Sequence, residues 1–235
     1  MEHLRRSVLC LFVAGLCVMT LGLNGCGRKE KAPAERTAAV PGEKRAEPVK
    51  EEIPMPSTAP ITEERVYYDF ETDLNGWEIP IWAQGKKDYV AGSAAVSAEA
   101  ASHGNTSMKI MADFPGGFWT AALVEIQQYL NMSPYRVISV DIYLPEGAPE
   151  GLKAKMVLTV GNNWKFVEMS RSVPLAAGKW VTLTANIEPG SYDWKRVVPD
   201  EEFAGDIRKI AIRVESNRQP KYAGPIYIDN IRAGR

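Results

Sequence analysis

The sequence predicts an all-β fold, an antiparallel β-sandwich, over residues 66–235. Short runs that alternate apolar and polar residues recur along this part of the chain, and Gly, Pro and Asn separate them. Alternation with a period of two is typical of a strand with one buried and one solvated face. No window of a dozen residues carries a convincing apolar stripe of 3.6-residue period, as an amphipathic helix would. Many short strands of this kind predict two packed antiparallel sheets.

The inward residues of the predicted strands stand at every second position. In "RVISVDIYLP" (136–145) the apolar residues fall on one face and the polar residues on the other. The segment "TAALVEIQQYL" (120–130) comes nearest to a helical pattern, but the flanking glycines and Trp119 favour a strand. The run "PIYIDNI" (225–231) closes the series. The predicted inward residues of the four runs before it are Ile138, Val140, Ile142 and Leu144; Met156, Leu158 and Val160; Val181, Leu183, Ala185 and Ile187; and Ile210, Ile212 and Val214.

Residues 1–25 have the pattern of a bacterial lipoprotein signal peptide. Arg5 and Arg6 precede an apolar run from Val8 to Leu23, which is short for a membrane span. The ending "LNGC" resembles a lipobox, in which Leu23, Gly25 and Cys26 match. The resemblance implies a lipidated Cys26 and a place at the bacterial cell envelope, at the outer membrane or the periplasmic face. An ordinary transmembrane anchor is the alternative.

Residues 26–65 are expected to form a disordered tether that leads to a single domain at 66–235. Pro, Ala, Glu, Lys and Arg dominate this segment, which has no hydrophobic period and cannot bury enough apolar surface to offset the cost of ordering. Cys26 is the only cysteine outside the predicted signal, so the domain has no disulfide. The net charge of −1 does not indicate a nucleic-acid partner.

A set of ordered landmarks resembles the galactose-binding-like jelly-roll domains that serve as carbohydrate-binding modules of bacterial mannanases and β-glucanases. The set begins with "YYDFETDLNGW" (67–77) and "SHGNTSMKI" (102–110). It continues through the strands described above and ends with "GPIYIDNIRAG" (224–234). The resemblance covers nearly all of residues 66–234. It implies a jelly roll that binds an oligosaccharide or polysaccharide of the mannan or β-glucan type without catalysis.

The same resemblance implies a structural Ca²⁺ where the first and last strands meet. Glu71 and Asp229 would supply carboxylates, and Asp69 and Asn105 further oxygens, which suits an ion that takes six to eight oxygen ligands. A solvated strand end is the alternative for these acids. Asp73 is expected to cap the "NG" turn instead.

Sugar-binding surfaces use Trp because the apolar face of a pyranose stacks on an aromatic ring. Trp82, Trp119 and Trp164 lie in Gly- or Asn-rich polar sequence and are the candidates for ligand contact. Gln84, Glu168 and Arg213 are the candidate partners for sugar hydroxyls. Among the other tryptophans, Trp77 is expected in the core and Trp180 on an edge strand, while Trp194 could sit at a rim or cover the end of the sandwich.

The sequence lacks the usual signatures of an enzyme. His103 is the only histidine beyond the predicted signal, and there is no Gly-rich phosphate loop or CxxC pair. The E-x-D-x-x-E strand motif of jelly-roll glycosidases is also absent. Two non-enzymatic functions remain open: a sugar-binding lipoprotein, and an envelope lipoprotein that binds a protein partner. Sugar binding predicts exposed aromatic rings in a groove, whereas protein binding predicts a flatter apolar patch.

Overall fold

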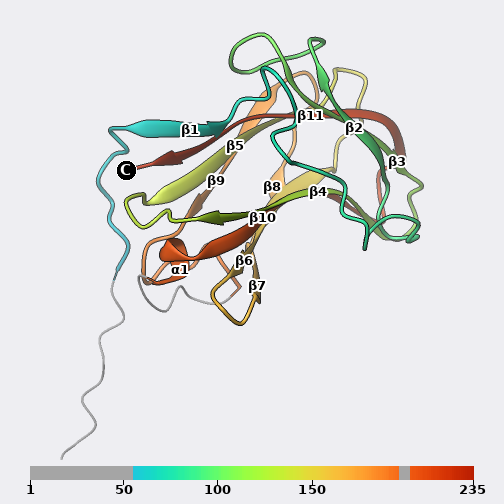
Figure 1. Ribbon diagram of the computed structural model, residues 1–235. Helices are drawn as coiled ribbons and strands as arrows, with labels where there is room; N and C mark the ends of the chain where they lie inside the picture. Colours follow the sequence, from blue (N-terminus) through green and yellow to red (C-terminus); the bar gives the residue numbers. More distant parts are fainter. Residues whose placement is uncertain (1–54, 196–201) are drawn as a thin grey trace, which may run out of the picture. The chain divides into compact units, whose positions relative to one another are not determined.

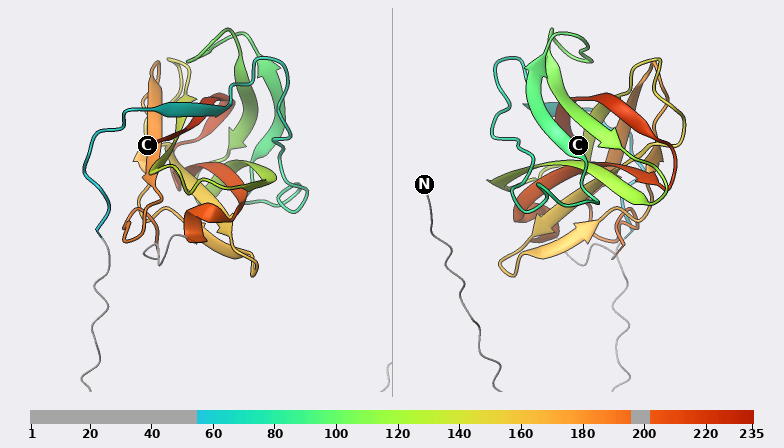
Figure 2. Two further views of the ribbon diagram at one scale, coloured as in Figure 1. Left: turned by 60° about the vertical axis from the view of Figure 1, so that its left-hand side comes forward. Right: turned by 90° about the vertical axis from the view of Figure 1, so that its right-hand side faces the viewer.

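The computed structural model describes residues 55–195 and 202–235. The predicted signal peptide, Cys26 and most of the predicted tether lie outside these residues. Within them the protein is a sandwich of two sheets, shown in Figures 1 and 2. All pairs between its named strands are antiparallel. The predicted all-β fold class is therefore confirmed.

Sheet A has six strands, in the order β2-β3-β11-β5-β9, with β1 also paired to β11. Sheet B has five strands, in the order β4-β10-β6-β7, with β8 also paired to β6. The strands of sheet A are β1 (Glu64–Tyr68), β2 (Ala91–Ser97), β3 (Ser107–Phe114), β5 (Val137–Tyr143), β9 (Trp180–Asn186) and β11 (Tyr222–Gly234). The strands of sheet B are β4 (Trp119–Leu130), β6 (Lys153–Val160), β7 (Lys165–Glu168), β8 (Val173–Pro174) and β10 (Ile207–Asn217).

The core lies between the two sheets and contains the inward residues that the alternation predicts, with Val181 only partly buried. Trp77 is 2% exposed, and its ring meets those of Tyr68 and Phe70 edge to face, as expected for a core residue. Trp194 is also 2% exposed and packs against Phe203 of the short helix α1 (Glu202–Gly205), so it belongs to the core rather than to a rim.

The first and last strands lie side by side, as the resemblance implies. Glu64 of β1 pairs with Gly234 of β11, which Figure 1 shows next to the C-terminus. The residues just before β1 also contact the sandwich: Arg136 donates hydrogen bonds to the carbonyl oxygens of Ser57 and Ala59 at 2.7 and 2.9 Å. Ser57 and Ala59, which fall within the predicted tether of residues 26–65, therefore contact the domain. No helix within residues 55–195 and 202–235 has the length and apolar character to cross a membrane.

Candidate binding site

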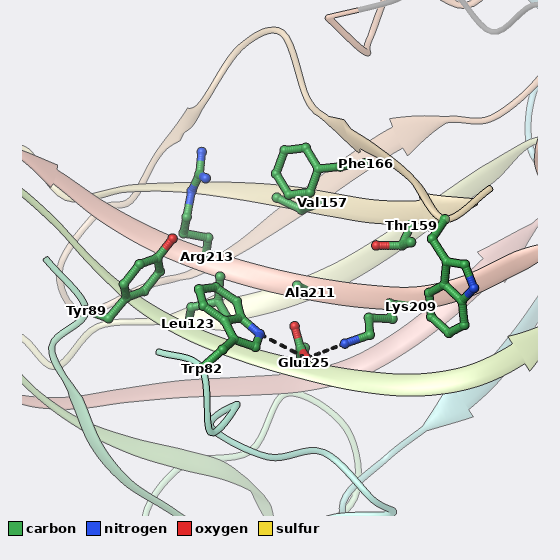
Figure 3. Close-up of a pocket in the computed structure, with 11 residues that line it drawn as sticks. Trp82, Tyr89, Leu123, Glu125, Val157, Thr159, Phe166, Lys209, Ala211 and Arg213 are labelled. Atoms are coloured by element: carbon green, nitrogen blue, oxygen red, sulfur yellow. Dashed lines mark hydrogen bonds and ion pairs between the residues drawn. The ribbon is translucent and has the colours of Figure 1, made fainter. Parts of the chain in front are cut away.

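A pocket of about 290 Å³ lies on the face of sheet B that points away from the core, and we call it the outer pocket (Figure 3). Its floor comes from adjacent strands, where Leu123 of β4, Ala211 of β10 and Val157 of β6 form a small second apolar cluster. All three are nearly buried although they face outward. The lining residues are Trp82, Tyr89, Leu123, Glu125, Val157, Thr159, Trp164, Phe166, Lys209, Ala211 and Arg213.

Aromatic side chains from outside the central strands form the walls of the outer pocket. Trp82 and Tyr89 come from the segment between β1 and β2, and their rings meet nearly at right angles at 5.0 Å. Trp164 lies in the turn between β6 and β7, and Phe166 lies on β7. Trp82, Trp164 and Phe166 are 44%, 41% and 61% exposed. Large apolar rings that remain open to solvent around a concave floor are typical of a ligand-binding surface.

The segment that carries Trp82 is fixed to the edge strand β4 at two places. Glu78 and Glu125 exchange backbone hydrogen bonds of 3.0 and 2.9 Å. Further along, the Val90 N–H donates to the carbonyl oxygen of Ala121 at 2.9 Å. A backbone turn between these points, in which the Ala83 N–H donates to the Pro80 carbonyl, places the Trp82 side chain over the floor. The wall is therefore held by backbone hydrogen bonds rather than by side-chain packing alone.

Two carboxylates of the outer face are held by cations. Glu125 Oε1 accepts hydrogen bonds from Lys209 Nζ at 2.8 Å and from Trp82 Nε1 at 3.4 Å, as Figure 3 shows. Glu168 Oε2 accepts from Arg213 at 2.6 Å, and Glu168 also pairs with Lys195. Burial raises the pKa of Glu168, but hydrogen bonds from Lys195 and Arg213 outweigh it and hold the pKa below its usual range. The outer pocket therefore presents ion-paired polar groups beside apolar rings.

The structure brings most of the predicted contact residues together. Trp82, Trp164 and Arg213 line the outer pocket. Trp119 lies beside it, with the Arg213 guanidinium 5.6 Å from its ring centre, and Glu168 holds that arginine. Gln84 does not join them, because its amide donates to the Ile79 carbonyl within its own loop at 3.0 Å.

Sequence reasoning missed Tyr89, Glu125, Phe166 and Lys209. One signal was present in the run "AALVEI" (121–126), where apolar residues occupy consecutive positions. A strand that is apolar on both faces has both faces covered.

The predicted calcium ligands lie around the turn at residues 102–106. The Glu71 carboxylate accepts backbone hydrogen bonds from Asn105 and Thr106 at 2.8 and 2.9 Å. The bond from Thr106 and then the bond from Asn105 lower the pKa of Glu71. Gly104 has a φ of 68°, and a β-carbon there would lie 2.3 Å from Glu71 Oε1, so only glycine permits this close approach.

Asp229 holds the same turn from the other side. It is fully buried, and its Oδ2 accepts from the backbone N–H groups of Ser102 and His103 at 2.8 and 3.0 Å. Burial raises the pKa of Asp229, although these hydrogen bonds act in the opposite direction. Backbone N–H donors of the turn at residues 102–106 thus bind the carboxylates of both Glu71 and Asp229.

The donor set fits Ca²⁺ only in part. Within the described ranges, no group of three or more His, Cys, Asp or Glu side chains could hold a metal ion. Asp229 is committed to N–H donors, whereas Asp69, Glu71 and Asn105 lie nearer the surface and retain oxygen atoms that a hard cation could use. Calcium therefore stays a prediction, with these three side chains as its remaining candidate ligands. Asp73 caps its turn as predicted, since its Oδ1 accepts from the Asn75 N–H at 2.5 Å.

Two antiparallel sheets with an aromatic pocket on one outer face define the class of jelly-roll β-sandwich found in carbohydrate-binding modules. The chain belongs to the family described as "Mannanase, galactose-binding domain-like", whose family model matches residues 68–230. No curated protein matches the sequence.

Solved structures share the fold at low sequence identity. The module CBM27-1 of Caldicellulosiruptor saccharolyticus, solved in complex with mannohexaose, is 18% identical, with a TM-score of 0.52 over 73% of this chain and 96% of that chain. A CBM28 module described as specific for non-crystalline cellulose is also 18% identical, with a TM-score of 0.54 over 74% of this chain and 96% of that chain.

Proposed function

We propose that the protein binds an oligosaccharide or polysaccharide of the mannan or β-glucan type in the outer pocket, without catalysis. The observation that carries the proposal is the arrangement of exposed rings around an apolar floor with ion-paired polar groups beside it. The apolar face of a sugar ring stacks on aromatic side chains, and fixed charged groups accept and donate hydrogen bonds at its hydroxyls. Membership of a mannanase-associated family supports the same ligand class.

The charge state of the pocket supports binding rather than hydrolysis. A glycosidase needs a carboxylic acid with a raised pKa to protonate the leaving oxygen. The pKa of Glu168 is instead lowered by Lys195 and Arg213, and Glu125 is paired with Lys209. A protein partner remains the alternative, but the concave site fits a narrow ligand better than a flat protein surface.

The test is calorimetric titration of the protein with manno- and cello-oligosaccharides. Trp82→Ala removes a ring from the wall of the outer pocket, and we expect it to weaken binding by about tenfold or more, the equivalent of about 1.4 kcal/mol. Trp180→Ala, on the edge strand of the other sheet, is the matched control and should leave the affinity unchanged. Equal losses in both variants, or no binding by the native protein, would reject sugar binding at this pocket.

Anchoring and calcium are separate parts of the proposal. Lipidation at Cys26 would hold the domain at the bacterial cell envelope, and the lipobox-like sequence supports it. We expect Cys26→Ala to release the protein from the membrane fraction and to abolish incorporation of labelled fatty acid.

Ca²⁺ at Asp69, Glu71 and Asn105 would raise the melting temperature by a few degrees and leave the sugar affinity unchanged. Identical melting curves in Ca²⁺ and in chelator would remove calcium from the proposal.

A further inference from the structure

A β-bulge in the central strand of sheet B turns an arginine onto the outer face. The pairing of β10 shifts register between Ile207 and Lys209 against both of its neighbours. Against β6 the extra residue is Arg208, whereas against β4 the extra residue lies on β4. Ile207 and Ile210 both point into the core, whereas Lys209 lines the outer pocket. In a regular strand, Arg208 and Lys209 would point to opposite faces. The bulge places both side chains on the outer side, as bulges near binding sites commonly do.

The Arg208 guanidinium lies against two aromatic rings at this end of sheet B. Its Cζ is 5.1 Å from the ring centre of Tyr129 and 5.3 Å from that of Trp164, both within cation–π range. Asp206 accepts hydrogen bonds from Arg208 Nε and Nη2 at 3.1 and 3.0 Å. A further bond runs from Nη2 to Asn162 Oδ1 in the turn before Trp164. Arg208 is 8% exposed, so its side chain is held in place by its neighbours and does not extend into solvent.

Trp164 is held in an unusual conformation by these contacts. Its φ is 53°, in the left-handed region that bulky residues rarely occupy, and its side chain is 41% exposed. The turn is tied to the segment before β10 by the Gly161 N–H, which donates to the Asp206 carbonyl at 2.9 Å. Strained residues of this kind persist where the surroundings fix them, and they cluster at ligand-binding sites.

We propose that Tyr129, Arg208 and Trp164 form a terminal subsite that continues the outer pocket along β4 and stacks a further sugar ring of the same chain. The inference rests on the proposed sugar binding and extends it to a chain-length preference. Tyr129 is 66% exposed and supplies the open ring. Arg208 is a positioning residue that fixes Trp164 and Tyr129 relative to one another.

The spacing supports a separate subsite. Glu125 in the outer pocket and Tyr129 are four residues apart on β4, which corresponds to about 14 Å along a strand. This distance exceeds one sugar ring, so a short oligosaccharide that occupies only the Trp82 end of the outer pocket does not reach Tyr129. The charge of Arg208 is compensated by Asp206, which suits a neutral sugar better than an anionic one.

The experiment is calorimetric titration of the protein with manno-oligosaccharides and cello-oligosaccharides from the trisaccharide to the hexasaccharide. We expect the native affinity to rise with length over this range. Tyr129→Ala should bind the trisaccharide within twofold of the native protein and the hexasaccharide about three- to tenfold more weakly, the range that stacking interactions give. Arg208→Lys keeps the charge but loses the planar group, and it should reduce the same length dependence.

Tyr192→Ala is the matched control, because Tyr192 is 64% exposed but lies outside the outer pocket. It should retain the native ratio of hexasaccharide to trisaccharide affinity. If Tyr129→Ala retains that ratio as well, the proposed terminal subsite is wrong. This variant should fold normally, because Tyr129 is exposed. If the native protein binds the sugars but with no gain in affinity beyond the trisaccharide, the subsite also fails while the outer pocket stands. Absence of all binding by the native protein would reject the proposed function itself.

Discussion

The outer faces of the two sheets both carry aromatic and charged side chains, but these side chains contact one another on sheet A and line an open pocket on sheet B. On sheet A, Trp180, Tyr143 and Tyr227 stand in one cross-strand row, with neighbouring rings 5.4 and 5.9 Å apart. The Tyr227 hydroxyl donates to Glu99, which also binds Lys109 at 2.6 Å. On sheet B the rings of Trp82, Trp164 and Phe166 remain open around a pocket.

The difference comes from what borders each row. On sheet A the polar groups near the row bind one another, and Asp141 accepts from Thr182, Asn230 and Arg232. On sheet B the segment with Trp82 and the turn with Trp164 stand beyond the strand edges and form walls. An aromatic row therefore does not define a binding site by itself. The same residue types stabilise the fold on one face and are available to a ligand on the other.

The largest effect expected from this comparison concerns stability at sheet A. Asp229→Ala would remove the buried acceptor that holds the backbone N–H groups of Ser102 and His103. We expect a loss of about 2–4 kcal/mol in the free energy of unfolding, since a hydrogen bond to a charged group contributes about 1.5–3 kcal/mol. Chemical denaturation measures this loss, and the protein that remains folded should bind sugar normally.

Asp73→Ala is the control for this change, because Asp73 caps an exposed turn, and it should cost about 1 kcal/mol or less. If the two variants are equally stable, the buried carboxylate does not hold the turn as described.

A smaller effect separates binding from stability. Phe166→Ala on sheet B should weaken sugar binding about three- to tenfold while it changes the unfolding free energy by less than about 1 kcal/mol, because the side chain is 61% exposed. Tyr143→Ala on sheet A should do the reverse, with a loss of about 1–2 kcal/mol in stability and unchanged affinity. Calorimetric titration and chemical denaturation of both variants test this. A single variant that lost both sugar affinity and stability would contradict the difference drawn between the two sheets.

The smallest effect is a dependence of stability on pH at the turn of residues 102–106. Backbone hydrogen bonds from Thr106 and Asn105 lower the pKa of Glu71 from its ordinary value of 4.5. A lowered pKa in the folded state means that the stabilisation is complete above about pH 4.5 and is lost as the pH falls through the folded value. We expect the melting temperature of Glu71→Gln to fall less steeply with acid than that of the native protein.

Asp229 acts with the opposite sign at this turn, because burial raises its pKa above the ordinary 3.8, so the folded state takes up its proton first. Protonation of Asp229 therefore favours the folded state as the pH falls, which opposes the loss of stability at Glu71. Parallel melting curves for the native protein and Glu71→Gln between pH 5 and pH 3 would contradict the role given to Glu71.

The sequence predicts the sandwich well and the binding face only in part. Alternation identifies the inward residues of the strands because burial on one face leaves a period of two. Trp82 and Trp164 are recognisable because a large ring in polar, glycine-rich sequence has little reason to be buried. Glu125 and Lys209 are not, since an outward charge on a strand looks the same whether it faces water or a pocket.

Arg208 shows a second reason for the limit. Strict alternation fails at a bulge, and the shift in register depends on how β10 pairs with both neighbours rather than on its own sequence. Gln84 shows a third, because its local bond to the Ile79 carbonyl competes with any role toward a ligand. The positions of Arg208 and Gln84 depend on contacts with groups that the local sequence pattern does not reveal.

The pairing of β1 with β11 has a consequence for how the domain can be combined with others. Arg235 accepts a backbone hydrogen bond from Thr62 at 2.9 Å and pairs with Glu63, so both ends of the domain lie side by side in sheet A. A domain whose ends leave together can be inserted into a surface loop of another protein, or carry a fused partner, with little disturbance to its fold. The outer face of sheet B belongs to the other layer, so a protein grafted at these ends would leave the outer pocket open.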